Sequence, residues 1–317
     1  MKLSVIVVSW NVLELLRECL HSLEREMSLS QGDWELIVID NDSKDGTVAM
    51  LREEFPQAKV LDKKENLGFG KANNIAFREC SGESVLLLNP DTIVLDHAID
   101  RMVDKLEQYP NAAAVGCRLQ NEDGSYQRWT GGAVPGLLNV TCHFLMAYKL
   151  LPMAPLPAPM YLEREPQQDV EVGWVSGACM LLRRNRLGDG IFDERFFMYG
   201  EDMELCSRMI RQGSTVIYTP AASIVHIEGG SLDGPAAELK AGKLRSLRVL
   251  FAMDHGAIAL LYYDLIVFFG FALRFLIFSL CSIWPSRRGF RARAARSGHF
   301  LVEAFVTLVL RRSPKRP

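Results

Sequence analysis

The stretch Leu3-Ser4-Val5-Ile6-Val7-Val8-Ser9-Trp10-Asn11 places a short apolar run directly before polar side chains. Three similar apolar runs follow within the first ninety residues, at 36–39, 59–61 and 85–88. The runs are continuous rather than alternating, which is typical of parallel strands covered on both faces. We therefore expect four strands of one buried sheet.

The segments between these runs have the period of helices. Residues 12–23 carry apolar side chains at a spacing near 3.6, and further helices are expected over 47–54, 71–79 and 96–106. Strands that alternate with helices favour right-handed crossovers. The pattern predicts a doubly wound, mainly parallel α/β sheet with flanking helices.

Composition excludes several classes of protein. The 317 residues are 49% hydrophobic, with 36 basic against 38 acidic side chains, which rules out a disordered, collagen-like or disulfide-scaffold chain. The net charge of −2 argues against a nucleic-acid binder. Seven cysteines without a CxxC pair or Cys/His metal spacing indicate reduced core residues of a cytosolic protein. The first apolar run is too short for a signal peptide, so we expect no export.

Polar residues follow each of the four predicted strands. They are Ser9 to Asn11, residues 40–43, residues 66–70 and residues 89–91. Ligands of such sheets bind outside the carboxyl ends of the strands. We expect these clusters to converge on one edge and to form the site.

Each cluster has a functional and a structural interpretation. Asp40 and Asp42 could accept hydrogen bonds from a nucleobase or ribose, or they could cap the following helix. Asp91 could hold Mg²⁺ or Mn²⁺ against a diphosphate, or belong to an Asn-Pro-Asp turn. No glycine-rich fingerprint follows the first strand, which disfavours a dehydrogenase and an ATPase. A diphosphate bound here would need a metal ion.

The second half of the chain supplies further candidates. Residues 152–166 contain five prolines and predict a loop, whereas 172–182, 215–218 and 224–226 predict strands. Residues 200–204 predict a helix start whose carboxylates either favour the helix dipole or include a general base. His226 ends a strand before residues 228–231, and it is either a metal ligand or an ordinary histidine.

Taken in order, these motifs resemble the inverting family 2 glycosyltransferases with the GT-A fold, especially the rhamnosyltransferase-like branch. The motifs are Val7-Val8-Ser9-Trp10-Asn11, Val38-Ile39-Asp40-Asn41-Asp42-Ser43 with Asp45-Gly46-Thr47, Asn66-Leu67-Gly68-Phe69-Gly70 with Asn73, Leu87-Leu88-Asn89-Pro90-Asp91, Trp174-Val175-Ser176-Gly177-Ala178, Phe192-Asp193-Glu194, Phe196-Phe197-Met198-Tyr199-Gly200-Glu201-Asp202, and His226. The resemblance covers roughly residues 1–255, which we expect to form the catalytic domain.

The resemblance implies transfer of a sugar from a nucleotide diphosphate donor to an acceptor hydroxyl, with inversion. It implies Asp202 as the catalytic base, and Asp91 with His226 as ligands of a divalent cation, Mg²⁺ or Mn²⁺. Asn89 stands where many relatives carry an aspartate, so we expect a thinner metal shell. The donor-side residues are Ser9, Asn11, Asp40, Asp42, Asn66, Gly68, Lys71, Asn73, Asn89 and Asp91. The acceptor-side residues are Trp174, Ser176, Gly177 and Glu201.

The C-terminal region, residues 256–317, has a different composition. Residues 256–284 are apolar and aromatic with only Asp264 and Arg274 charged, and five arginines follow between 287 and 296. The two charges divide the segment, so we expect helices in the membrane plane or a re-entrant hairpin rather than a span. The segment 300–310 is too short to span, and basic neighbours would bind anionic lipids. The alternatives are a buried helical hairpin and an interface of a homo-oligomer.

The sequence thus predicts a membrane-associated transferase on the cytoplasmic face of the inner or plasma membrane, acting in cell-surface polysaccharide assembly. The expected partners are a nucleotide-sugar donor, with rhamnose from dTDP-rhamnose preferred, and a lipid-linked glycan acceptor. One alternative is another sugar from a UDP or GDP donor. An alternative of another class is an inactive membrane-bound scaffold that binds glycans.

Overall fold

The structure, a computed structural model, forms two compact units. Unit 1 comprises residues 1–134 and 161–233, and unit 2 comprises residues 135–160 and 234–317. The residues described are 2–29, 32–151, 153–227, 236–283 and 289–310. The sequence predicts that a catalytic domain ends at residue 255 and that a membrane-associating region follows. This functional boundary stays a prediction.

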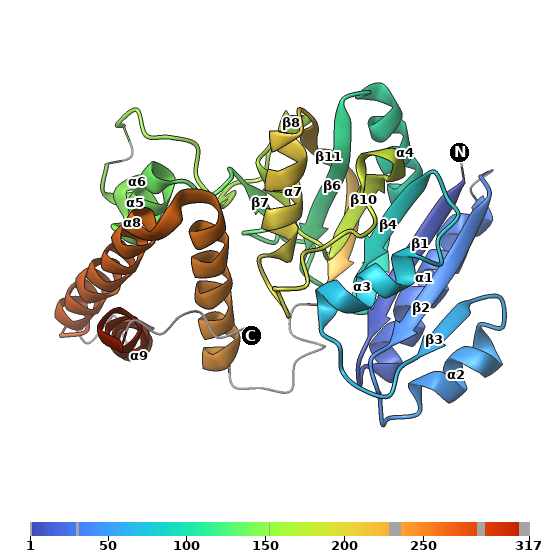
Figure 1. Cartoon of the computed structure of the whole chain (residues 1–317), viewed down its shortest axis with the longest axis horizontal. Coiled ribbons are helices and arrows are strands. Elements are labelled where there is room, and N and C mark those ends of the chain that lie inside the picture. The colour runs from blue at the N-terminus through green and yellow to red at the C-terminus, as the bar shows by residue number, and fades with distance from the viewer. Residues whose placement is uncertain (1, 30–31, 152, 228–235, 284–288, 311–317) are drawn as a thin grey trace. The chain divides into compact units, whose positions relative to one another are not determined.

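A mixed sheet forms the centre of unit 1 (Figure 1). Its order is β3-β2-β1-β4-β10-β6-β11-β5, and β8 also pairs with β11. The first four strands in the chain are parallel, as predicted, whereas β10 runs antiparallel to both of its neighbours. The strands are β1 Leu3–Ser9, β2 Trp34–Asp40, β3 Lys59–Asp62, β4 Ser84–Leu88, β5 Thr92–Val94, β6 Ala112–Gln120, β7 Gly131–Gly132, β8 Val170–Glu171, β9 Trp174–Val175, β10 Cys179–Arg183 and β11 Thr215–His226.

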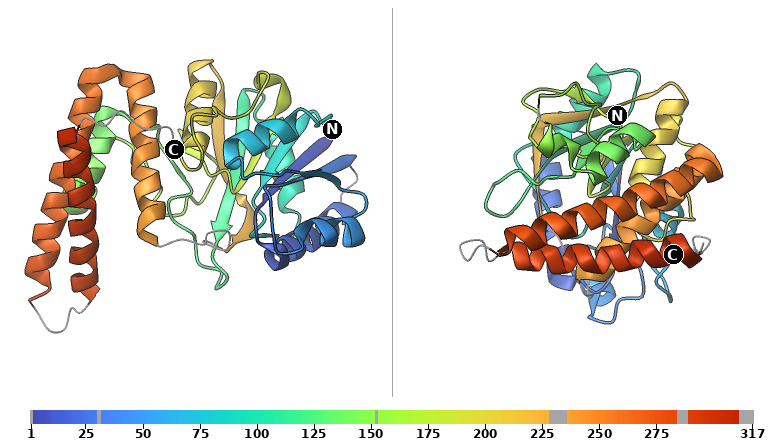
Figure 2. Two further views of the ribbon diagram at one scale, coloured as in Figure 1. Left: turned by 60° about the horizontal axis from the view of Figure 1, so that its bottom comes forward. Right: turned by 90° about the vertical axis from the view of Figure 1, so that its left-hand side faces the viewer.

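Helices cover both faces of this sheet (Figures 1 and 2). In Figure 1, α3 and α7 lie on the viewer's side of the sheet. The helices of unit 1 are α1 Leu13–Leu29, α2 Thr47–Glu54, α3 Phe69–Phe77, α4 Ala98–Gln108 and α7 Glu201–Arg211, with a short 3-10 turn at Arg184–Arg186. The four helices expected between residues 12 and 106 are therefore present.

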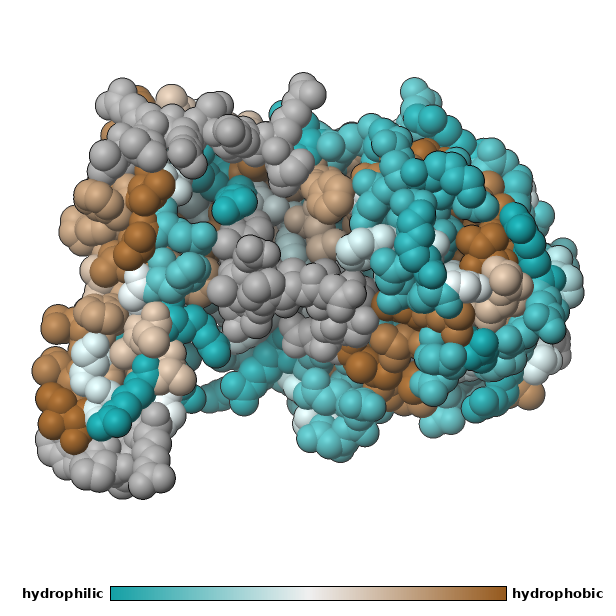
Figure 3. Space-filling model, turned by 90° about the horizontal axis from the view of Figure 1, so that it is seen from below, coloured by the Kyte–Doolittle hydropathy of each residue, from teal (hydrophilic) through white to brown (hydrophobic). Residues whose placement is uncertain are grey.

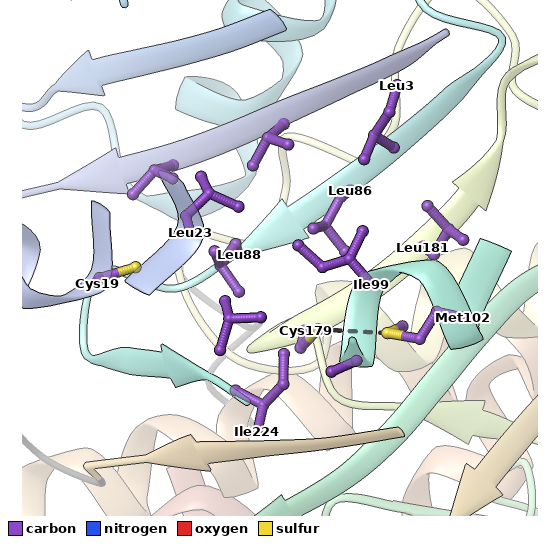
Figure 4. Close-up of a cluster of buried hydrophobic side chains, with 14 of the residues drawn as sticks. Leu3, Cys19, Leu23, Leu86, Leu88, Ile99, Met102, Cys179, Leu181 and Ile224 are labelled. Atoms are coloured by element: carbon purple, nitrogen blue, oxygen red, sulfur yellow. Dashed lines mark hydrogen bonds between the residues drawn. The ribbon is translucent and has the colours of Figure 1, made fainter. Parts of the chain in front are cut away.

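The main core of unit 1 lies between the sheet and helices α1, α2 and α4 (Figure 4). Alternate residues of β1, namely Leu3, Val5 and Val7, point into it and are almost fully buried. Burial of each such side chain is worth about 1.5–3 kcal/mol, so this layer fixes the sheet. The strand ends that carry the polar motifs are thereby held in place.

Two expected strands differ from the prediction. The apolar run 172–182 forms two strands, β9 and β10, and β9 pairs with β7 in a separate two-stranded sheet. The chain turns between them at residues 176–178, which carry site residues. Residues 215–226 form the single strand β11, with a register shift between Thr219 and Ser223 around Pro220. A proline lacks the N–H that the ladder needs, which explains the irregularity there.

Unit 2 is helical. Its helices are α5 Leu137–Phe144, α6 Ala147–Leu150, α8 Ala236–Cys281 and α9 Gly289–Leu310. Helix α8 changes direction at Gly256, where φ is 75°. The proline-rich segment forms neither helix nor strand over 153–166, in agreement with the predicted loop.

The charges in the apolar segment do not break α8, which continues through Asp264 and Arg274. Its part His255–Cys281 is long and apolar enough to cross a bilayer by length and composition. The two charges therefore lie within one continuous helix, and the expected arrangement of this segment in the membrane plane or as a re-entrant hairpin stays a prediction. Some of the basic residues that are expected to contact lipids lie outside the described residues, namely Arg287, Arg288, Arg311, Arg312, Lys315 and Arg316.

Candidate active site

The carboxyl ends of β1 and β2 place Ser9 beside Asp40, its partner in the parallel register. Both residues are buried. Asp40 Oδ2 accepts a hydrogen bond of 2.9 Å from the backbone N–H of Ser43, while Asp40 Oδ1 and Ser9 Oγ have no hydrogen-bond partner. Burial raises the pKa of Asp40. Buried polar atoms without partners are costly, so this corner is suited to a polar ligand.

The loop after β2 is tied to the loop after β1. The backbone N–H of Asn11 donates to Ser43 Oγ at 2.9 Å, and the N–H of Lys44 donates to Asn11 Oδ1 at 2.7 Å. Asn11 and Asp42 both have positive φ, 52° and 70°. Asp42 forms an ion pair with Lys44 at the surface.

Helix capping in this loop is performed by Asp45. Its Oδ2 accepts the N–H of Leu13, the first residue of α1, at 2.9 Å, and its Oδ1 accepts the N–H of Thr47 at 3.1 Å. These bonds satisfy donors that a helix start leaves open. The capping alternative therefore applies to Asp45, and the neighbouring Asp40 and Asp42 remain donor-side candidates.

The loop 66–69 approaches the segment that precedes α7. Gly68 has φ 77° and ψ 177°, and Asn66 Oδ1 accepts its N–H at 2.9 Å. A Cβ on Gly68 would lie 2.6 Å from the carbonyl oxygen of Phe197. The N–H of Phe69 donates to that same oxygen at 2.9 Å. Only glycine fits this close backbone contact.

Two further donor-side candidates lie on α3. Lys71 is exposed, and Asn73 is buried with its Nδ2 donating to the Phe69 carbonyl at 3.0 Å. The adjacent Asn74 was not predicted, yet its side chain bonds to the N–H groups of Ile191 and Phe192 at 2.8 and 2.9 Å. Asn74 therefore fixes the segment leading to α7.

Asp91 and His226 come together from distant parts of the sequence. Asp91 precedes β5, His226 ends β11, and the two strands are antiparallel neighbours. His226 Nε2 lies 3.5 Å from Asp91 Oδ1, and both side chains are largely buried. An imidazole nitrogen and a carboxylate oxygen are suitable ligands for a divalent transition-metal ion such as Mn²⁺.

Gln127, which sequence reasoning missed, orients this histidine. Its Oε1 lies 2.7 Å from His226 Nδ1, and its Nε2 donates to the His226 carbonyl at 3.3 Å. The second bond fixes the amide orientation, so Oε1 accepts the proton of Nδ1. The other ring nitrogen, His226 Nε2, then presents its lone pair toward Asp91, as a ligating histidine requires.

Asp91 and His226 could hold a divalent cation whose remaining ligands come from a bound molecule. Across the part of the chain that the structure describes, no group of three or more His, Cys, Asp or Glu side chains could hold a metal ion. Phosphate oxygens commonly complete such a coordination shell. The residues present are therefore consistent with a cation bound together with a diphosphate.

Asp202 lies in the first turn of α7, after Tyr199 and Gly200 with φ of 67° and 82°. The N–H of Gly177 donates to Asp202 Oδ2 at 3.3 Å, and the N–H of Met203 donates to Oδ1 at 2.8 Å. These bonds orient a carboxylate that is only partly buried. The arrangement leaves the Asp202 carboxylate partly accessible, and its role as a base stays a prediction.

Glu201 differs from its neighbour because it is 6% exposed and its Oε2 has no hydrogen-bond partner. Burial, and second the charge of Asp202, raise the pKa of Glu201 to about 8. Glu201 is therefore mainly protonated at neutral pH, which distinguishes the two carboxyl groups chemically.

Of the other acceptor-side candidates, Trp174 is 2% exposed and Ser176 is held by its backbone, whose N–H donates to the Thr130 carbonyl at 2.9 Å. The buried side chains of Trp174 and Glu201 support the site from within. Their contact with an acceptor stays a prediction.

The donor side and the Asp202 side are joined by short contacts. The N–H of Asn89, at the end of β4, donates to the Ala178 carbonyl at 2.9 Å, and Gly177 holds Asp202. The turn at residues 176–178 therefore connects the motif that contains Asp91 to the carboxylate of Asp202. Asp42 pairs with Lys44, Asn73 bonds within α3 and Lys71 is exposed, so their roles at the site stay predictions.

The mixed α/β sheet, with its polar strand ends and a partly exposed carboxylate opposite an Asp–His pair, defines a GT-A-type fold. Residues 4–189 match the family model described as glycosyl transferase family 2, and the chain belongs to this family. The resemblance recognised in the sequence is therefore confirmed.

Individual relatives agree with this assignment. The chain is 30% identical over 232 residues to the N-acetylglucosaminyl-diphospho-decaprenol L-rhamnosyltransferase of Mycobacterium tuberculosis, covering 69% of this chain and 75% of the relative. It is 26% identical to rhamnosyltransferase WbbL of Escherichia coli, covering 63% and 75%. The chain is thus rhamnosyltransferase-like.

A solved structure shows the same fold. The mannosyltransferase PcManGT from Pyrobaculum calidifontis, in complex with GDP-Man and Mn²⁺, superposes with a TM-score of 0.63 at 16% identity. The match covers 98% of this chain and 88% of that one. At this identity the likeness supports the architecture alone.

Proposed function

We propose that this protein is a membrane-associated, inverting glycosyltransferase that moves rhamnose from dTDP-rhamnose to a hydroxyl of a lipid-linked glycan. The observation that carries the proposal is the short connection between Asp202 and the Asp91–His226 pair, through residues 177–178 and Asn89. The preference for rhamnose and for a lipid-linked acceptor rests on the M. tuberculosis relative, whose name describes that reaction.

Asp202 acts as the general base in this proposal. A sugar hydroxyl is a poor nucleophile, so its proton must leave as its oxygen attacks the anomeric carbon. The proton passes to the Asp202 carboxylate, a new C–O bond forms, and the anomeric bond to the diphosphate breaks on the opposite face. The bonding pair leaves with the nucleoside diphosphate, and the anomeric configuration inverts.

The opposite side of the site binds the donor. Asp91 and His226 would hold a divalent cation, Mg²⁺ or Mn²⁺, which when bound neutralises the charge that grows on the departing diphosphate. Ser9 and Asp40 offer buried polar atoms without hydrogen-bond partners to the nucleoside. Asp202 and this donor side therefore serve different parts of one displacement.

Unit 2 supplies the proposed membrane contact, and the two charges within its apolar segment, Asp264 and Arg274, are satisfied internally. Arg248 Nε and Nη2 donate to the Asp264 carboxylate at 2.7 and 2.9 Å. Arg274 Nη2 donates to the His143 carbonyl at 2.7 Å, and Nη1 donates to that of Phe144, at the end of α5. A cation at a helix C-terminus is favourable. Neither Asp264 nor Arg274 needs water as its partner.

Many apolar side chains of α8 and α9 are exposed, and Figure 3 shows apolar patches interspersed with hydrophilic residues on this part of the molecule. Only 11% of the most apolar stretch of His255–Cys281 is buried within the structure, which disfavours a buried core helix. Arg291, Arg293 and Arg296 are exposed on α9 and suit anionic headgroups. The exposed apolar side chains include Ile258, Leu261, Tyr262, Phe269, Phe275, Leu276, Leu280, Val302, Phe305 and Val306. We place the catalytic site on the cytoplasmic face, where nucleotide sugars are made.

The transferase proposal is tested by release of nucleoside diphosphate. Purified full-length protein in detergent is incubated with Mn²⁺, a short-chain lipid N-acetylglucosaminyl diphosphate, and dTDP-rhamnose, UDP-N-acetylglucosamine or GDP-mannose. We expect acceptor-dependent release of dTDP and its loss in Asp202→Asn. Asp189→Asn, at an exposed carboxylate before the same helix, serves as the matched control and should stay active.

Other outcomes discriminate between the alternatives. Release of UDP or GDP would keep the transferase and overturn the rhamnose assignment. No release from any donor, with no donor binding by calorimetry, would overturn the transferase and favour the inactive glycan-binding scaffold.

Membrane association is tested separately by flotation of the full-length protein with vesicles. We expect binding to vesicles that contain phosphatidylglycerol, and weaker binding when Arg291, Arg293 and Arg296 are each replaced by glutamine. Absence of flotation with every vesicle, for protein that still binds donor, would refute this part of the proposal.

A further inference from the structure

Three aromatic side chains form a row that begins at β9, the strand directly before the turn at residues 176–178. The ring centroids of Trp129 and Tyr161 are 6.4 Å apart at 57°, and those of Tyr161 and Trp174 are 5.8 Å apart at 86°. Trp174 is buried, Tyr161 is partly buried, and Trp129 is 56% exposed. The row thus extends from the interior to the surface.

The backbone holds this row next to the base. Gly131 and Gly132 of β7 pair with Val175 and Trp174 of β9, and the Ser176 N–H donates to the Thr130 carbonyl at 2.9 Å. The next residue, Gly177, donates its N–H to Asp202. The loop that carries Trp129 is therefore connected to the carboxylate of Asp202 by three consecutive residues, 175–177.

The position of Tyr161 agrees with this placement. Burial, and second the charge of Asp202, raise the pKa of the Tyr161 phenol. Leu162, the residue after Tyr161, accepts the Trp129 N–H at 3.3 Å and donates its own N–H to the Gly131 carbonyl at 2.7 Å.

The backbone conformation of Trp129 is energetically unfavourable. Its φ is 67°, which is unfavourable for a bulky residue, and most of its large apolar surface faces solvent. Backbone strain of this kind clusters at ligand-binding sites, where the surrounding structure maintains it. A pyranose ring offers a face of C–H groups to an aromatic ring and keeps its hydroxyls at the edge, where a base can reach them.

We propose that Trp129 and Tyr161 form the subsite for the pyranose ring of the acceptor, with its reacting hydroxyl directed to Asp202. The proposal rests on the proposed function in taking Asp202 as the base. It assigns acceptor recognition to two residues outside the motifs that identify the family.

The kinetic test compares Trp129→Ala, Trp129→Phe and the wild type with the short-chain lipid N-acetylglucosaminyl diphosphate as the acceptor. We expect the acceptor KM to rise about tenfold in Trp129→Ala and by less in Trp129→Phe. The donor KM and kcat should stay near the wild-type values. Leu29→Ala, which removes an equally exposed apolar side chain at 61% exposure, is the matched control. An unchanged acceptor KM in a folded Trp129→Ala protein would overturn the proposal.

A binding test keeps this proposal separate from the proposed function. Without donor, the same probe is titrated while tryptophan fluorescence is measured for wild type and Trp129→Phe. We expect a saturable change that is largely lost in the variant. If no donor turns over but this change is seen, the subsite stands and the transferase fails. If the wild type and Trp129→Phe respond alike, the subsite is refuted even in an active enzyme.

Discussion

The contact between Gln127 and His226 makes a sharp prediction about metal affinity. Gln127 is 6% exposed, and its Oε1 lies 2.7 Å from His226 Nδ1. Replacement by leucine keeps a similar volume and removes both hydrogen bonds to the histidine. The ring then loses the acceptor that fixes its tautomer and orientation.

The magnitude follows from the role of such partners. Loss of a hydrogen-bond partner of a ligating histidine costs about 10–100-fold in metal affinity, or about 1.4–2.7 kcal/mol. We expect Gln127→Leu to lie in this range. Gln127→Glu keeps an acceptor at Nδ1 and should retain affinity. The direct cost to folding is about 1 kcal/mol for a lost hydrogen bond.

The assay is Mn²⁺ binding in the presence of dTDP, followed by the loss of the free-ion electron paramagnetic resonance signal. Gln120→Leu is the matched control, because Gln120 Oε1 accepts hydrogen bonds from Ser223 Oγ at 3.4 Å and from Arg118 Nη1 rather than from His226. Thermal unfolding reports whether each variant folds. Equal Mn²⁺ affinity in wild type and a folded Gln127→Leu would refute the assignment of His226 as an oriented ligand.

Three further predictions concern stability. Since the pKa of Glu201 is raised from 4.5 to about 8, the wild-type fold loses stability as pH rises through this window. Glu201→Gln should therefore gain up to about 5 kcal/mol over wild type at pH 9 and nothing near pH 4, in denaturant titrations at the two pH values. Gly68→Ala should lower the free energy of unfolding by about 1–3 kcal/mol because of its backbone angles, and the clash of the new Cβ with Phe197 adds to this loss. Calorimetry should also show weaker donor binding. An unaffected melting temperature would contradict the prediction. Asp264→Ala should destabilise unit 2 by about 3–5 kcal/mol, because it leaves the charge of Arg248 without its partner. A double variant with Arg248→Met and Asp264→Leu should recover most of that loss, as judged by protease resistance in detergent. Equal sensitivity of the single and the double variant would show that the loss does not come from an unpaired charge.

The early strands and helices were predictable because their signals are local. The runs at 3–8, 36–39, 59–61 and 85–88 and the helical spacings between them depend only on neighbouring residues. The antiparallel β10 was not predictable, because its partners β4 and β6 are distant in sequence. The turn at 176–178, which interrupts an apolar run, is fixed by contacts of β9 with β7.

The residues of the candidate site also fall into those that local sequence could identify and those that it could not. Residues of recognisable motifs, such as Asp91, Asp202 and His226, were identified from the sequence. Gln127 and Trp129 were not, because nothing local distinguishes them and only the pairing of β7 with β9 and the course of β11 give them their neighbours. The sequence likewise could not show that Arg274, a charge within an apolar segment, has hydrogen-bond partners on α5.

The sequence by itself determined the family, the parallel half of the sheet and the strand ends where the chemistry lies, because apolar periodicity and motif order are properties of the linear chain. Only the tertiary structure decided which side chains meet at those ends. It made Glu201 a buried acid and left Asp202 partly exposed beside it, placed Gln127 behind His226, and turned the charges of α8 toward internal partners. Burial and hydrogen bonding act through space between residues far apart in the chain, so no local pattern of residues records them.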